Sequence, residues 1–215
     1  MIHESYYWKK ELYNSFLTIA KFRNLKRTTE KSYVKVEKAL LLGAYIIRKL
    51  DDAKKIPQNM LQTEVILEVA ISNGTIVDHL NWHKIENHYD LEKISEVTKD
   101  WMFIVNQIIH SYTLIYSYDN SNKFDGFIIN SDRTKKESLF FLTLKNLFTI
   151  FLTVSEGDMT SASWKRQLIS KENVKPIFGE MKLEETVYNF PKEFNLEKVI
   201  FETMEGNIYV RSENE

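Results

Sequence analysis

Two stretches with helical periodicity come first in the chain. Apolar residues within residues 5–22 recur every three or four positions and form one stripe of an amphipathic helix. The same spacing returns in residues 30–52, where further apolar positions widen the stripe and indicate deep burial. Only a short polar and basic segment, residues 24–29, separates the two stretches. Because short connections favour antiparallel neighbours, we expect a helical hairpin, and we expect Pro57 to end this helical section.

Strand and helix patterns alternate in the next part of the chain. Residues 63–71 are rich in aliphatic and β-branched side chains, and Asn73-Gly74 then precedes another apolar pair. Asn-Gly between apolar runs is the strongest short-range sign of a two-residue turn, so a β-hairpin is predicted here. Residues 90–110 return to the helical period, which predicts a helix of about six turns.

A second hairpin pattern follows this helix. Residues 113–118 and 124–129 have the composition of strands around a polar turn. Residues 139–142, beyond a charged turn, are expected to extend the same sheet. Residues 144–154 fit a helix that closes the core.

The segment after residue 155 lacks the regular apolar periodicity of the rest of the chain. Pro176 and Pro191 interrupt any regular pattern. Only residues 198–203 and 207–211 resemble strands, which predicts a terminal β-hairpin.

The predicted fold class is α+β. A chain of 215 residues fits one large domain with a modest extension. We expect a core domain over residues 1–155, built from an antiparallel helix hairpin and a central helix with small antiparallel β-hairpins. Residues 156–215 are expected to form a C-terminal extension, and the sequence leaves open whether it packs on this core.

Composition removes several classes of function. The chain has no cysteine, which excludes disulfides and thiolate enzymes and fits a reducing compartment. The N-terminal residues lack the pattern of a targeting segment, so a cytoplasmic protein is expected. The most apolar stretch, residues 139–154, contains Lys145 and Asn146, so no membrane span and no membrane partner are expected.

Charge and glycine content narrow the choice further. The formal net charge of −1 gives no overall field that attracts nucleic acid, so such a partner must be held by a local patch. With six glycines and no Gly-rich phosphate loop, a Walker-type nucleotide hydrolase is excluded and no cofactor is expected.

Polar residues gather at the end of the predicted central helix. Asn106 and His110 are four positions apart, which on a helix places them on one face and within reach of a single phosphate. An imidazole in that position can shuttle a proton near neutral pH.

The motif Asn106-x-x-x-His110-x-Tyr112 resembles the Arg-Asn-x-x-x-His-x-Tyr pattern of HEPN-domain proteins. These are helical nucleotide-binding modules of prokaryotic conflict systems, and many are metal-independent ribonucleases that pair the motif helices of two subunits. The resemblance implies that His110 is the catalytic acid or base and that Asn106 and Tyr112 orient the phosphate. It also implies a homodimer.

The chain departs from this pattern at one position. It has Val105 where the family has its arginine, the residue that would neutralise the charge developing on phosphorus. A replacement cation must come from elsewhere, and the candidates are Arg48, Lys84 and Arg133. A second interpretation makes His110 a capping residue that satisfies the last carbonyls of its helix.

Three of the five histidines lie within residues 78–88. His79 and His83 have the spacing of helical metal ligands, but the intervening residues lack the glutamate of a zinc protease and no third ligand follows, so no metal site is expected. Asn81 and His83 are predicted to begin a short helix. Because free N–H groups at a helix start favour anions, Asn81, His83 and Lys84 are candidate phosphate contacts.

Two hypotheses for the function remain. The first is an RNA- or nucleotide-directed effector of a bacterial toxin–antitoxin or phage-defence system, with or without catalytic activity. The second is a non-catalytic interaction module, such as an antitoxin, immunity or scaffold subunit, that binds a protein partner.

Overall fold

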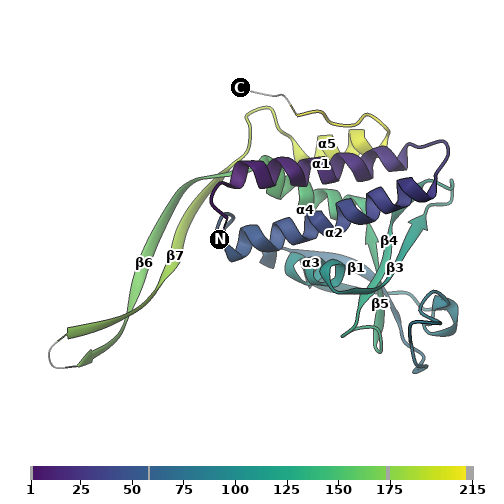
Figure 1. Ribbon diagram of the computed structural model, residues 1–215, viewed down its shortest axis with the longest axis horizontal. Coiled ribbons are helices and arrows are strands. Elements are labelled where there is room, and N and C mark those ends of the chain that lie inside the picture. The colour runs from purple at the N-terminus through teal and green to yellow at the C-terminus, as the bar shows by residue number, and fades with distance from the viewer. Residues whose placement is uncertain (1, 58, 173–174, 212–215) are drawn as a thin grey trace.

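The structure confirms the α+β class. It is a computed structural model that describes residues 2–57, 59–172 and 175–211. Helices gather on one side of a five-stranded antiparallel sheet, and a long two-stranded arm projects from the opposite end of the helical layer (Figure 1).

The two N-terminal helices form the expected antiparallel hairpin (Figure 1). Helix α1 is Ser5–Arg23 and helix α2 is Glu30–Asp52. Thr29 begins α2 with a capping box, in which its hydroxyl oxygen accepts a hydrogen bond from the Ser32 N–H at 3.3 Å and its own N–H donates to the Ser32 hydroxyl at 2.8 Å.

Helix α2 ends at Asp52, as predicted, and a local closure terminates it before Pro57 is reached. Lys54 adopts the left-handed conformation with φ of 55°. The Lys54 N–H then donates to the Asp51 carbonyl and the Lys55 N–H to the Leu50 carbonyl. This pair of bonds is a Schellman closure, which terminates a helix without proline.

The main sheet has the strand order β2-β1-β5-β4-β3. All four strand pairs are antiparallel. The predicted strands of the second hairpin and its extension are confirmed as β3, β4 and β5. The five strands are β1 Glu64–Ile71, β2 Ser95–Asp100, β3 Ser111–Tyr118, β4 Phe124–Ser131 and β5 Ser138–Thr143.

The hairpin predicted at Asn73-Gly74 is wrong. Strand β1 pairs with β2 and β5, and residues 72–94 form a long connection joined to the sheet by a bridge between Ser72 and Tyr89. Gly74 lies in a bend, with φ of 89°. The pairing of β1 depends instead on burial between strands distant in sequence.

Only the second half of residues 90–110 is helical. Helix α3 is Trp101–Ile109, and it starts where the Asp100 carboxylate accepts a hydrogen bond from the Phe103 N–H at 2.7 Å. The preceding residues form edge strand β2. Leu91 and Ile94 are 36% and 40% exposed, so the apolar stripe predicted for them faces no core.

The C-terminal segment differs from its predicted structure in two respects. Strands β6 (Asp158–Glu172) and β7 (Lys175–Asn189) form the projecting arm, which the sequence did not indicate. Residues 198–203, expected as a strand, belong to helix α5 (Leu196–Met204), and residues 207–211 form no strand. The Asn195 side chain caps α5 by accepting from the Lys198 N–H at 2.9 Å.

Lys9 of α1 holds the base of the arm. Its buried ammonium group donates to the Gly157 carbonyl at 2.5 Å and to the Asp158 carboxylate at 2.6 Å. Burial lowers the pKa of Lys9, although the Asp158 carboxylate acts in the opposite direction. Helix α5 packs on α4 (Leu144–Glu156), and so the C-terminal segment contacts the core through both the arm and α5.

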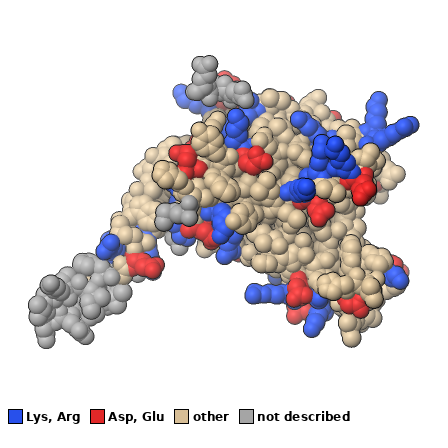
Figure 2. Space-filling model, viewed as in Figure 1, with Lys and Arg blue, Asp and Glu red and all other residues tan. Residues whose placement is uncertain are grey.

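Charged side chains of both signs are interspersed over the face shown in Figure 2, and no uniformly basic region covers it. A nucleic-acid partner on this face would therefore depend on local clusters of cations. Within the part of the chain that the structure describes, no helix has the length and apolarity needed to cross a membrane.

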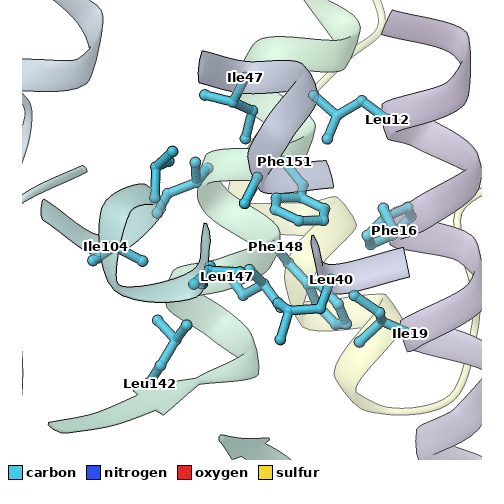
Figure 3. Close-up of a cluster of buried hydrophobic side chains, with 14 of the residues drawn as sticks. Leu12, Phe16, Ile19, Leu40, Ile47, Ile104, Leu142, Leu147, Phe148 and Phe151 are labelled. Carbon is cyan, nitrogen blue, oxygen red and sulfur yellow. The ribbon is translucent and has the colours of Figure 1, made fainter. Parts of the chain in front are cut away.

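The main core lies between the helices and one face of the sheet (Figure 3). Aromatic rings of α1 and α4 meet there edge to face, with the Phe16 and Phe148 centroids 4.9 Å apart. Alternate strand residues point to the opposite face, where a smaller apolar cluster packs beneath the 72–94 connection. The residues labelled in the main core are Leu12, Phe16, Ile19, Leu40, Ile47, Ile104, Leu142, Leu147, Phe148 and Phe151.

Candidate functional site

Four of the residues predicted from the sequence line one cleft. Arg48 comes from α2, Asn106 from α3, His110 from the residue after α3, and Arg133 from the turn between β4 and β5. The cleft has a volume of about 600 Å³. We call it the α2–α3 cleft. It therefore combines two cations, an amide and an imidazole.

Arg48 is oriented by three neighbours. Its Nη1 lies 3.3 Å from Asn106 Oδ1 and 3.0 Å from the Met102 sulfur. Its Nε lies 3.4 Å from the Asp52 carboxylate, one turn further along α2. The side chain is 39% exposed, so the guanidinium is held in place while remaining open to a ligand.

Val105 points away from the cleft. It is 1% exposed and belongs to the main core, so an arginine at this position would place its charge among apolar side chains. Arg48 reaches Asn106 from the neighbouring helix instead. Of the three candidate cations, Arg48 and Arg133 line the cleft and Lys84 lies elsewhere.

The imidazole of His110 does not cap helix α3. The backbone N–H of His110, rather than its imidazole, donates to the Asn106 carbonyl at 3.0 Å and caps α3. The residue is exposed and lines the cleft, and no hydrogen bond of its ring is found within the described residues. The hypothesis of a capping imidazole is therefore not what the geometry shows.

Gln107 fixes the turn that carries Arg133. Its buried Oε1 accepts hydrogen bonds from the Ser131 N–H at 2.8 Å and from the Thr134 hydroxyl at 2.9 Å. These bonds attach the β4–β5 turn to α3 across the bottom of the cleft. Sequence reasoning did not identify Gln107, although its place beside Asn106 in a strongly apolar helix marks it as a polar residue in need of partners.

Asp132 adds a negative charge at the rim of the cleft. Its carboxylate lies 2.8 Å from the Lys135 ammonium, which lowers the pKa of Asp132 by hydrogen bonding and by direct attraction. Asp132 therefore stays ionised but locally neutralised. The nearby Arg133 has no ion-pair partner within the described ranges, so its charge is available to a ligand.

Tyr112 is not brought to the cleft. The pairing of β3 with β4 shifts register between Ser111 and Thr113, and this irregularity directs Tyr112 to the far face of the sheet. There its ring lies beside His79, with centroids 5.3 Å apart, and beneath the Lys135 ammonium at 3.4 Å. Its expected part in orienting a phosphate has no geometric support.

Asn81, His83 and Lys84 also lie on the far face, in the 72–94 connection. They do not begin an α-helix, because the next element is the short 3₁₀ turn Ile85–Asn87. The Asn81 side chain instead builds a turn, accepting from the Asp78 N–H and donating to the Ile76 carbonyl. The helix-start phosphate site predicted here is therefore wrong.

Comparison with known proteins adds no relative. No family model, no curated protein and no solved structure matches the chain. The resemblance to HEPN-domain proteins thus stays a prediction.

The donor set of this cleft suits an anion. Within residues 2–57, 59–172 and 175–211, no group of three or more His, Asp or Glu side chains is arranged to hold a metal ion. The cleft offers two guanidinium groups and the amide N–H₂ of Asn106, all of which donate hydrogen bonds to phosphate oxygens. His110 adds a group that can exchange a proton.

Proposed function

We propose that the chain is a HEPN-like effector of a bacterial conflict system and that its α2–α3 cleft binds a phosphate of RNA or of a nucleotide. The contact between Arg48 and Asn106 carries this proposal, because it supplies a guanidinium beside the motif amide and the exposed His110. Arginine suits phosphate better than lysine, since its planar fork donates two hydrogen bonds to two oxygens.

The proposed reaction is metal-independent cleavage of an RNA phosphodiester. The 2′-oxygen attacks phosphorus, the bond to the 5′-oxygen breaks, and a 2′,3′-cyclic phosphate remains. His110 accepts the proton of the 2′-hydroxyl, and in a homodimer His110 of a second copy donates a proton to the leaving 5′-oxygen. The same residue of two copies thereby serves as base and acid.

Arg48 and Asn106 would stabilise the pentacoordinate state. Negative charge builds on the non-bridging oxygens as the nucleophile attacks, and a guanidinium aimed at those oxygens lowers the barrier. The Asn106 carbonyl oxygen orients Arg48, which leaves the amide N–H₂ of Asn106 for the phosphate. Arg133 would contact the phosphate from the turn opposite α2.

The binding step is tested by NMR of the histidine rings during titration with uridine monophosphate. His110 signals should shift with added nucleotide, whereas the signals of His83, an exposed histidine of the 72–94 connection that does not line the cleft, should not. Unchanged His110 signals at millimolar nucleotide would contradict phosphate binding in the cleft.

The projecting arm favours a second candidate function, a protein-interaction module. Leu168 and Met181 are 46% and 47% exposed on a ribbon of two strands that lies outside the main sheet. Exposed apolar side chains on a projecting ribbon are typical of a contact surface. A Leu168→Ser/Met181→Ser variant that loses a copurifying partner and retains RNA cleavage would establish this function beside the first.

A further inference from the structure

A larger groove lies where the base of the arm meets the ends of α1 and α2. Its volume is about 750 Å³, and it is lined by three aromatic side chains, Trp8, Tyr45 and Trp164, which come from α1, α2 and β6. We call it the arm groove. Tyr45 and Trp164 are 45% and 42% exposed, so their rings are accessible to a ligand.

Basic side chains accompany these rings. Lys49, Lys54 and Lys55 line the arm groove, and Asp52 is the one acidic residue among its described lining. The Lys49 ammonium lies 5.6 Å from the centroid of the Tyr45 ring. Aromatic faces interleaved with cations are what a single nucleic-acid strand requires, since bases stack on the rings and phosphates meet the cations.

The conformation of Lys54 supports a role for its side chain. Lys54 occupies the position after the helix cap with φ of 55°, where glycine avoids the steric clash that a Cβ suffers. A lysine kept in this conformation strains the backbone, and the same turn directs both Lys54 and Lys55 to the groove. Backbone strain of this kind gathers at binding sites.

The last turn of α2 lies between the arm groove and the α2–α3 cleft. Arg48 lines the cleft, Lys49 lines the groove, and both contact the carboxylate of Asp52, at 3.4 Å and 3.3 Å. A strand whose scissile phosphate lies in the cleft therefore reaches the groove by passing around the end of α2.

We infer that the arm groove binds the single-stranded RNA flanking the scissile phosphate. The inference rests on the proposed function for the identity of the ligand. In this arrangement Tyr45 and Trp164 stack on bases, and Lys49, Lys54 and Lys55 contact the backbone phosphates.

The test uses the whole chain and two probes. Binding is measured with a fluorescent 2′-O-methyl uridine dodecamer, which resists cleavage because its nucleophile is blocked. Turnover is measured with the dinucleotide uridylyl-adenosine, which is too short to reach from the cleft to the groove. The groove variant is Lys54→Gly/Lys55→Gln, and the matched control is Lys35→Gln/Lys38→Gln on the exposed side of α2.

The groove variant should bind the dodecamer about tenfold more weakly, with a log K against log salt slope shallower by about 1.4 for two lost contacts. Its Tm should equal that of wild type or exceed it by about 2–4 °C, because glycine relieves the strain at position 54. Dinucleotide turnover and the control variant should be unchanged. Trp164→Ala should weaken dodecamer binding about tenfold, and Trp164→Phe should restore most of it.

Dodecamer binding that is unaffected by the groove variant and by Trp164→Ala would overturn the inference. So would displacement of the dodecamer by polyglutamate as readily as by polyuridylate, since that result assigns the groove to an acidic protein chain. Dodecamer binding that depends on Lys54 and Lys55, without any cleavage of the dinucleotide, would support RNA binding in the arm groove. It would contradict only the proposed catalytic function.

Discussion

Arg48 Nη1 lies 3.3 Å from Asn106 Oδ1, although the two residues are 58 positions apart in the chain. The contact joins the N-terminal helix hairpin to the helix that carries the polar motif. It gives the motif a guanidinium that its own sequence lacks, since Val105 occupies the corresponding position inside the core. The proposed function depends on this pair and on the exposed His110.

Substitution of Arg48 should abolish most catalysis and spare the fold. Arg48→Ala is expected to lower kcat for RNA cleavage by about 10²–10³, the usual loss when one transition-state donor is removed. The side chain is 39% exposed, so stability should change little. Lys38→Ala, which removes an exposed cation from the same helix, is the control and should be fully active. Equal kcat values for Arg48→Ala and wild type would exclude Arg48 from the site.

Gln107 should matter to both stability and activity. Gln107→Leu removes the acceptor of two hydrogen bonds at the β4–β5 turn, which should lower the free energy of unfolding by about 1–3 kcal/mol. The freed turn should also displace Arg133 and raise KM. Urea unfolding measures the first effect, with the exposed Gln62→Leu as control. If the free energy of unfolding falls no more than in the control, the hydrogen bonds of Gln107 do not stabilise the turn.

Glu156 should make stability depend on pH. Its carboxylate is buried and its Oε1 has no hydrogen-bond partner within the described residues. Burial raises the pKa of Glu156 above its unfolded value, despite Arg211 and the Tyr209 hydroxyl. Folding therefore favours the protonated form, and the carboxylate becomes destabilising as pH rises from the unfolded pKa through the folded pKa.

Glu156→Gln removes this ionisation. The variant should have a higher Tm than wild type at pH 8, and the difference should fall toward zero at pH 4, where the wild-type side chain is protonated in the folded state. Differential scanning fluorimetry at the two pH values measures this, with the exposed Glu68→Gln as control. A Tm difference that grows as pH falls would reverse the assigned direction of the pKa shift.

Apolar periodicity and turn residues predicted most of the helices and strands correctly. Helices α1, α2 and α4 and strands β3, β4 and β5 follow from apolar periodicity and turn residues, and each buries the face that the pattern indicates. The wrong predictions concern segments in which tertiary packing decides the secondary structure against the apolar periodicity. Ser95–Asp100 fits a helical stripe, but it pairs with β1 at the edge of the sheet. Residues 198–203 contain β-branched side chains, yet the Asn195 cap and packing on α4 make them helical.

The sequence predicted which types of side chain form the candidate site, but only some of the residues that line it. Asn106 and His110 share a helix end, so their approach follows from spacing alone. Arg48 and Arg133 were candidates by charge, and only tertiary packing places them at the cleft. Tyr112 was assigned to the site by resemblance, whereas the register shift in β3 sends it to the opposite face. A one-residue irregularity of this kind leaves no mark in composition or period.

The most direct test of the account is cleavage of end-labelled RNA, single-stranded and structured, in the presence of EDTA. Wild type and His83→Ala, which changes an exposed histidine outside the cleft, should give the same discrete products on a sequencing gel. His110→Ala should give none. Identical products from His110→Ala, or no cleavage of either RNA by wild type, would contradict the assignment of the α2–α3 cleft as a ribonuclease site.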